Sequence, residues 1–212
     1  MSTRNPQLSQ HFLKSPRLAL KLIGHSNLKK RDLVLDIGAG SGVITTALAK
    51  RVREVWAIEP DHATAEKLRA NLRKYHIQNV RVIEQDFLRV DLPTEPYKIF
   101  ANPPFHLSAK IFYRLLGLEN HDGNIIRATA SPLKPDAIYL ILQKQLALKL
   151  IATDRHYTSQ LGRQILHDYD ARIRLPLRAD DFTPPPAVPT VFYEAKLRQC
   201  ETKLRRPFNK TD

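Results

Sequence analysis

The four residues Asn102-Pro103-Pro104-Phe105 could activate an amine that is a poor nucleophile. The exocyclic amine of adenine is such a poor nucleophile, because its lone pair is delocalised into the ring. The Asn102 side-chain oxygen and the Pro103 carbonyl could accept its two hydrogens and draw the nitrogen toward tetrahedral geometry. Prolines hold such acceptors rigidly, and Phe105 offers a ring on which a displaced base can stack. The alternative is an Asx-Pro turn without a chemical role.

A glycine-rich loop follows the apolar run at residues 33–37. Glycines at 38, 40 and 42 let the backbone turn tightly and approach a ligand closely. In open α/β sheets, ligands bind beyond the carboxyl ends of the strands, where this loop would lie. A nicotinamide-binding loop would place its third glycine at Val43. The spacing favours an adenosine-sulfonium ligand without a pyrophosphate, S-adenosylmethionine, over a turn that binds nothing.

Acidic residues end the next two apolar runs. Glu59 follows residues 54–58 and is placed to accept hydrogen bonds from ribose hydroxyls. Asp86 follows residues 80–84 and precedes an aromatic, so it could accept the amine hydrogen of a cofactor adenine. The alternative for Asp86 is a residue that only caps a turn.

These segments are positioned by alternating apolar runs and helical patterns. Ser15 and Pro16 mark the start of the first helix. We expect a class I, Rossmann-like α/β fold: a mostly parallel, seven-stranded, doubly wound sheet with an antiparallel pair at its edge. The expected strands are 33–37, 54–58, 80–84, 97–101, 137–142, 171–175 and 190–197, and the expected helices are 16–23, 43–53, 61–74, 108–116, 143–151 and one ending near 166.

Composition excludes several classes of protein. With no run of eighteen apolar residues and no apolar leader, neither a membrane span nor a secretory signal is expected. The single cysteine, Cys200, suits a reducing cytoplasm, and no Cys/His cluster has the spacing of a metal site. We expect one domain at residues 1–198 and a short basic tail at 199–212, in a cytoplasmic monomer without a metal.

The charge favours a polyanionic partner. Thirty-four Lys and Arg against 21 Asp and Glu give a net charge of +13, and basic side chains set against phosphates release counterions. Residues 1–31 contain seven basic residues and no acidic one. Residues 196–212 carry six basic residues and two acidic ones. Both ends are therefore expected to border a nucleic-acid surface, the alternative being a merely soluble basic surface.

Together the motifs resemble those of the ribosomal RNA adenine N6-methyltransferases, the superfamily of the Erm macrolide-resistance enzymes and the small-subunit dimethyladenosine transferases. The resemblance covers residues 9 to about 197. It rests on Gln10-His11-Phe12-Leu13, Asp36 to Thr45, Glu59, Asp86-Phe87, Asn102-Pro103-Pro104-Phe105 and Phe182-Thr183-Pro184-Pro185-Pro186-Ala187-Val188.

The resemblance implies S-adenosylmethionine as the methyl donor and an adenine of ribosomal RNA as the acceptor. Asn102, Pro103 and Phe105 would serve the target base. Gly38 would face the methionine part of the cofactor, Glu59 the ribose and Asp86 the adenine. The residues implied at the cofactor site are His11, Leu13, Gly38, Gly40, Glu59, Asp86 and Asn102.

Three departures from the family pattern bear on the substrate. His11 stands where the family usually has Asn, so its contact is expected through the backbone. Asn102-Pro103-Pro104-Phe105 stands where the family usually has Asn-Ile/Leu-Pro-Tyr, and is closer to adenine DNA methyltransferases. Family members usually continue into a helical C-terminal domain, which is largely missing from this sequence. A shortened, Erm-like enzyme that modifies large-subunit (23S) RNA and confers macrolide-type resistance is the favoured interpretation. Small-subunit RNA, DNA and a non-catalytic nucleic-acid-binding role remain alternatives.

Overall fold

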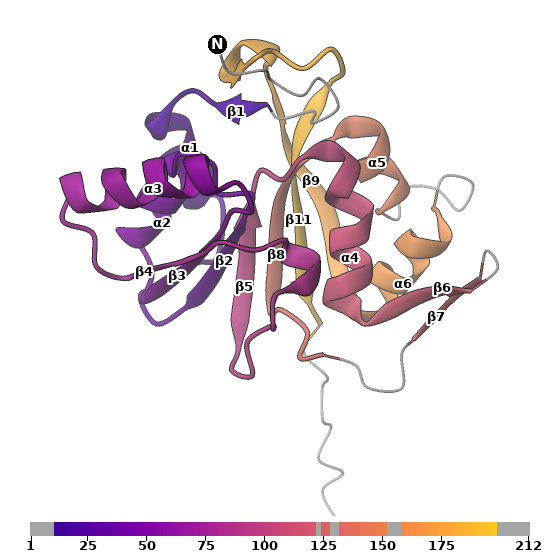
Figure 1. Ribbon diagram of the computed structural model, residues 1–212. Coiled ribbons are helices and arrows are strands. Elements are labelled where there is room, and N and C mark those ends of the chain that lie inside the picture. The colour runs from indigo at the N-terminus through magenta and orange to yellow at the C-terminus, as the bar shows by residue number, and fades with distance from the viewer. Residues whose placement is uncertain (1–10, 122–123, 128–131, 152–157, 199–212) are drawn as a thin grey trace, which may run out of the picture.

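The computed structural model describes residues 11–121, 124–127, 132–151 and 158–198. A seven-stranded sheet of order β4-β3-β2-β5-β8-β11-β9 forms its centre (Figure 1). In this sheet β11 runs antiparallel to both of its neighbours, and the other paired strands are parallel. The expected mostly parallel sheet with an antiparallel edge is thereby confirmed. The strands are β2 (Leu33–Ile37), β3 (Glu54–Ile58), β4 (Val80–Ile83), β5 (Tyr97–Ala101), β8 (Ala137–Gln143), β9 (Tyr169–Leu177) and β11 (Thr190–Leu197).

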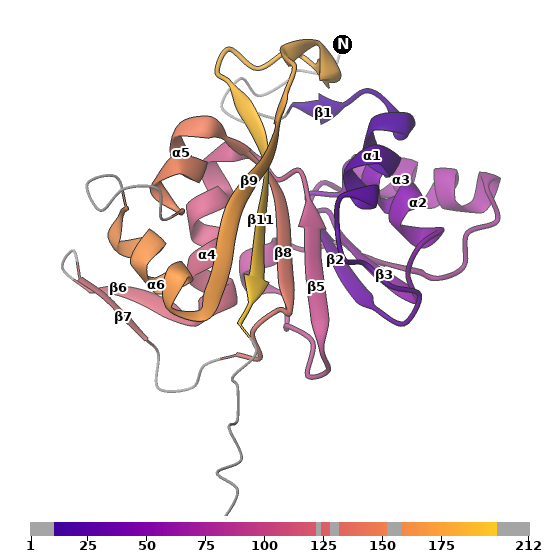
Figure 2. The same ribbon diagram turned by 180° about the vertical axis from the view of Figure 1, so that it is seen from behind.

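Helices cover both faces of the sheet, as the two opposite views show (Figures 1 and 2). One group is α1 (Pro16–Gly24), α2 (Val43–Ala49) and α3 (His62–Lys74), and the other is α4 (Ser108–Leu116), α5 (Lys144–Lys149) and α6 (Gln160–Asp168). Ser15 caps α1 as expected, since its hydroxyl accepts from the Leu18 N–H at 3.4 Å.

The central strands are buried along almost their whole length because both of their faces are covered, and their residues are apolar except for Asp36 in β2, Lys98 in β5 and Gln143 in β8. Every residue of β2 and β5 is buried, as are the first six of β8. Their side chains divide between two large hydrophobic clusters, one on each face of the sheet. The rigid core therefore ends where β2, β3 and β5 end, and the predicted chemical residues follow at those points.

Four features differ from the sequence expectation. The helix expected to reach Arg53 ends at Ala49, because the chain turns there and the Arg53 N–H bonds to the Asp32 carbonyl at 3.1 Å. Strand β9 is longer at both ends than expected. A hairpin of β6 (Leu118–His121) and β7 (Asn124–Arg127) has no strand-like apolar alternation and was not predicted. Nor was the pairing of β1 (Phe12–Leu13) with β10 (Phe182–Thr183).

Three short 3₁₀ turns complete the elements: η1 (Phe87–Arg89), η2 (Phe105–Leu107) and η3 (Ala179–Asp181). Within the described ranges no helix is long and apolar enough to cross a membrane. Gln10 of the first motif and the proposed tail at 199–212 lie outside the described residues.

Candidate active site

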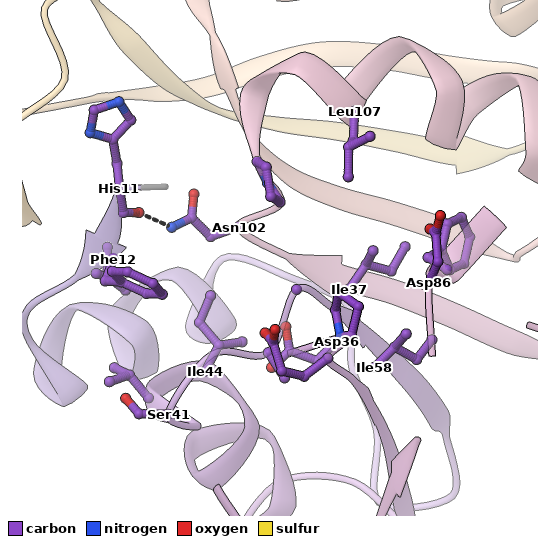
Figure 3. Close-up of a pocket in the computed structure, with 18 residues that line it drawn as sticks. His11, Phe12, Asp36, Ile37, Ser41, Ile44, Ile58, Asp86, Asn102 and Leu107 are labelled. Carbon is purple, nitrogen blue, oxygen red and sulfur yellow. Dashed lines mark hydrogen bonds between the residues drawn. The ribbon is translucent and has the colours of Figure 1, made fainter. Parts of the chain in front are cut away.

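A cavity lies at the carboxyl edge of the sheet, where the ends of β2, β3 and β5 meet (Figure 3). Its empty volume is about 900 Å³, part of it open to solvent, which is in the range of cofactor pockets. Six of the predicted site residues line it: His11, Leu13, Gly38, Glu59, Asp86 and Asn102. Gly40, Pro103 and Phe105 do not contribute to its wall.

Gly38 lies where the glycine loop meets the Asn102–Phe105 segment. Its φ is +72°, and a Cβ added there would lie 3.2 Å from the Cδ of Pro104. Its N–H and that of Ala39 both donate to the Ile58 carbonyl, at 2.9 and 3.1 Å. Because a side chain would be strained by both the backbone and Pro104, only glycine suits this close approach.

Glu59 is buried and held by two backbone donors. Its Oε2 accepts from the Gly40 N–H at 2.9 Å, and its Oε1 from the Asp61 N–H at 3.1 Å. Burial raises the pKa of Glu59, and these two hydrogen bonds oppose the rise. A carboxylate has about four acceptor positions, so each oxygen keeps a lone pair for a ligand hydroxyl. Gly40 thus orients Glu59 and does not itself line the cavity.

Asp36 also lines the cavity, and the sequence analysis did not place it in the site. It is 1% exposed, and its Oδ2 accepts from the Thr45 hydroxyl at 2.7 Å. Burial raises the pKa of Asp36 to about 7, and the nearby Glu59 adds to the rise while the Thr45 bond opposes it. A carboxyl group with a strongly shifted pKa in a cleft is a typical feature of functional sites.

Asp86 lines the cavity and also caps a turn. Its Oδ1 accepts from the Leu88 N–H at 3.0 Å at the start of η1. Asp86 therefore caps a turn, whereas the alternative that it does only this remains a prediction. The capping does not compete with the ligand-facing role, because Asp86 is exposed and borders the cavity.

Asn102 follows β5 and has its amide orientation fixed. Its Nδ2 donates to the backbone carbonyl of His11 at 2.6 Å (Figure 3). The planar amide therefore directs Oδ1 away from His11. Within the described residues, no hydrogen bond uses this oxygen or the Pro103 carbonyl. The two acceptors named from the sequence are thus available to a ligand.

The ring of Phe105 is less exposed than expected for a residue on which a displaced base stacks. The residue is 9% exposed, and its ring centroid lies 5.3 Å from that of the His11 imidazole, with an interplanar angle of 35°. The His11 side chain turns away from the cavity toward the proline corner, where its Nδ1 lies 2.8 Å from the Pro184 carbonyl.

Apolar residues complete the wall of the cavity. Phe12 is 44% exposed, and its ring lies 3.0 Å from where a Cβ on Gly40 would be. The other lining residues were not assigned to the site from the sequence, although most belong to the motifs or adjoin them, and all but Ser41 are apolar. They are Ile37, Ala39, Ser41, Val43, Ile44, Ile58, Pro60, Phe87, Pro104 and Leu107.

The lining fits an adenosyl amino-acid cofactor. Buried or oriented carboxylates at Asp36, Glu59 and Asp86 can accept from amine and hydroxyl hydrogens, and the apolar wall can hold an adenine ring. Gly38 leaves room for close approach of the ligand to the backbone. S-adenosylmethionine would supply the electrophilic methyl group at this edge.

Comparison with known protein families agrees with the kind of cofactor that this cavity fits. Residues 1–201 match the model of the family described as ribosomal RNA adenine dimethylase. The chain belongs to this family. Its members use S-adenosylmethionine as the methyl donor, and the expected resemblance to ribosomal RNA adenine methyltransferases is confirmed.

Individual relatives fall into two groups. A probable ribosomal RNA small subunit methyltransferase A of Thermococcus onnurineus is 42% identical over 113 residues, which cover 53% of this chain and 40% of the relative. An rRNA adenine N-6-methyltransferase of Enterococcus faecalis is 33% identical over 193 residues, which cover 89% of this chain and 69% of that enzyme. The chain thus spans from less than half to about two thirds of these relatives.

A solved structure shares the fold. A dimethyladenosine transferase from Plasmodium falciparum superimposes with a TM-score of 0.74 at 23% identity, covering 89% of this chain and 64% of that protein. This likeness supports the class I methyltransferase architecture.

Proposed function

We propose that this chain transfers the methyl group of S-adenosylmethionine to the N6 amine of an adenine in 23S ribosomal RNA, as a cytoplasmic monomer, and thereby confers macrolide-type resistance. The observation that carries the proposal is the orientation of Asn102 at the rim of the cavity. Asn102 lines the cavity and Pro103 follows it directly; the proposal uses Asn102 Oδ1 and the Pro103 carbonyl as two neutral acceptors for an incoming amine.

The proposed chemistry is an in-line displacement at the methyl carbon. The two acceptors bind the amine hydrogens and localise the nitrogen lone pair, which attacks the methyl group. S-adenosylmethionine, when bound, would supply this methyl group from its sulfonium and leave as a neutral thioether, and the methylated amine would release one proton to solvent. Acceptors that are already oriented lower the barrier because they need no reorganisation during the reaction.

The charge of the chain supports an RNA substrate. The net charge is +13, and the basic residues near the start of the described chain are exposed: Lys14, Arg17, Lys21, Lys29, Lys30 and Arg31. Each cation set against a phosphate adds a salt-dependent contribution to affinity.

Small-subunit RNA is the second candidate, favoured by the identity to the small-subunit methyltransferase A of Thermococcus onnurineus. The test is incubation with labelled S-adenosylmethionine and separate pools of large-subunit RNA, small-subunit RNA and duplex DNA, followed by nucleoside analysis. The proposal predicts N6-methyladenine in large-subunit RNA. Label confined to small-subunit RNA would favour the second candidate, and label in none of the pools would contradict both.

Resistance is tested separately in cells. Expression of the gene in a macrolide-sensitive host should raise the inhibitory concentration of erythromycin. Expression of an Asn102→Ala variant at the same level should not. Equal sensitivity of cells with and without the active gene would contradict the resistance role while leaving the chemistry open to the RNA assay.

A further inference from the structure

His11 connects three parts of the chain that are far apart in sequence. Its backbone carbonyl accepts from Asn102 Nδ2 at 2.6 Å, and its imidazole Nδ1 bonds to the Pro184 carbonyl at 2.8 Å. Its ring also packs on Phe105 with a centroid distance of 5.3 Å. One residue thus contacts both ends of the Asn102–Phe105 segment and the proline corner.

The imidazole bond continues a short antiparallel pairing. Phe12 lies opposite Thr183 and Leu13 opposite Phe182, so His11 comes next, opposite Pro184. A proline has no N–H to give to a strand ladder, and the pairing of β1 with β10 covers only two residues. The His11 side chain supplies a donor to the Pro184 carbonyl at this position, and so fixes the His11 backbone beyond the end of the ladder.

The position of the His11 backbone in turn determines the orientation of Asn102. The amide of Asn102 could rotate to present either its nitrogen or its oxygen to the cavity. The bond from Nδ2 to the His11 carbonyl selects one orientation, with Oδ1 directed away from His11. A shift of this carbonyl would release the amide, and positioned groups lose much of their effect when they move by about 1 Å.

We propose that His11 is a positioning residue: its side chain holds the N-terminal segment on Pro184 so that its carbonyl orients Asn102 for the incoming amine. The inference rests on the proposed role of Asn102. It adds to the backbone contact with the cofactor expected for His11 from the sequence, because it gives a role to the side chain, which is directed to Pro184 and Phe105. The required property of the side chain is a hydrogen-bond donor at the δ position.

Two substitutions of His11 distinguish the effect of the hydrogen-bond donor from the effect of side-chain size. His11→Asn places an amide Nδ2 where the imidazole has Nδ1, so a donor is kept. His11→Leu keeps an apolar side chain of moderate size and removes the donor. His167→Ala is the matched control, since His167 is an exposed histidine whose Nδ1 bonds to Asp168 at 2.9 Å on α6.

The first readout is single-turnover methyl transfer with cofactor and RNA saturating. His11→Leu should be slower by about tenfold, His11→Asn within about threefold of the unmodified protein, and His167→Ala unchanged. Cofactor affinity from calorimetry should be unchanged in His167→Ala, and saturating cofactor separates the rate loss in His11→Leu from any change in cofactor binding. In an Asn102→Ala background, His11→Leu should cause no further loss of rate, because residues in one network are not additive. An unchanged rate in His11→Leu, or a further tenfold loss in the double variant, would overturn the proposal.

The second readout does not depend on activity. Protein labelled with ¹⁵N-asparagine gives a side-chain signal of Asn102, identified by its disappearance in Asn102→Ala. The signal should move in His11→Leu and His11→Ala, and stay in place in His11→Asn and His167→Ala. An unmoved signal in His11→Leu and His11→Ala would overturn the positioning role. Absence of methyl transfer by the unmodified protein would instead contradict the proposed function.

Discussion

Two buried carboxyl groups, Asp36 and Glu59, lie close enough at the cavity wall for Glu59 to help raise the pKa of Asp36. The sequence motif named Glu59 because it ends a strand, and the structure places it at the cavity wall. Asp36 was part of the glycine-loop motif but was not assigned to the site, because it lies inside the strand that precedes the loop. The raised pKa of Asp36 follows from burial, and the nearby Glu59 adds to it; that these two carboxyl groups lie close together at the cavity required the structure.

The first prediction at this scale concerns cofactor binding. Glu59→Ala removes an acceptor proposed for the ribose hydroxyls and also the partner of two backbone N–H groups. Affinity for S-adenosylmethionine should fall by about 1–3 kcal/mol, because the ribose hydroxyls would be left without this acceptor in the bound state. Calorimetry measures the affinity. A folded Glu59→Ala protein with unchanged affinity would contradict the assignment.

The second prediction concerns Asp36 and pH. Because the folded-state pKa is about 7 and the ordinary value is 3.8, the folded protein keeps a proton that the unfolded chain releases between these two pH values. The contribution of the protonated Asp36 carboxyl to the free energy of unfolding is therefore full below about pH 4 and is lost as the pH rises toward 7. Asp36→Asn cannot ionise, and its side-chain oxygen can still accept from Thr45.

The free energy of unfolding of Asp36→Asn, measured relative to the unmodified protein, should therefore rise between pH 4 and pH 8. The expected rise is roughly 2–4 kcal/mol, from about 1.4 kcal/mol per unit of pKa. Denaturant unfolding over a series of pH values measures it. A difference that is constant across this range would show that Asp36 ionises as easily in the folded as in the unfolded state.

At the scale of elements, the glycine loop joins the cofactor side of the cavity to the Asn102–Phe105 segment. Gly38→Ala places a Cβ 3.2 Å from Pro104 at a φ of +72°. This should destabilise the protein by about 1–3 kcal/mol and weaken cofactor binding. Gly24→Ala is the matched control, because nothing lies within 4 Å of the added Cβ. Equal thermal stability of the two variants would show that the loop tolerates a side chain.

The elements that were predictable are those whose pattern is set by burial. Leu33–Ile37 and Tyr97–Ala101 are apolar apart from Asp36 and Lys98, because both faces of the sheet are covered. The pairing of Phe12–Leu13 with Phe182–Thr183 was not predictable. It joins residues about 170 positions apart, and its backbone hydrogen bonds do not require particular residue types. The orientation of Asn102 depends on this pairing, so it also required the structure.

At the scale of the whole molecule, the excess of basic residues predicts strongly salt-dependent RNA binding. The logarithm of the association constant should fall by roughly 0.7–0.9 per phosphate contact for each tenfold rise in salt. Removal of residues 199–212, which include Lys203, Arg205, Arg206 and Lys210, should flatten this slope and leave cofactor affinity unchanged. An identical slope after truncation would show that the tail does not contact RNA.

The central claim is that Asn102 activates the target amine, and single-turnover methylation of a large-subunit RNA fragment by Asn102→Ala tests it most directly. With cofactor and RNA saturating, the rate of methyl transfer should fall by on the order of a hundredfold or more, because an acceptor bond that strengthens in the transition state acts on kcat. Phe105→Tyr, which keeps the ring, should retain nearly the full rate in the same assay. Full activity of a folded Asn102→Ala protein would contradict the account and reduce the segment after β5 to a turn.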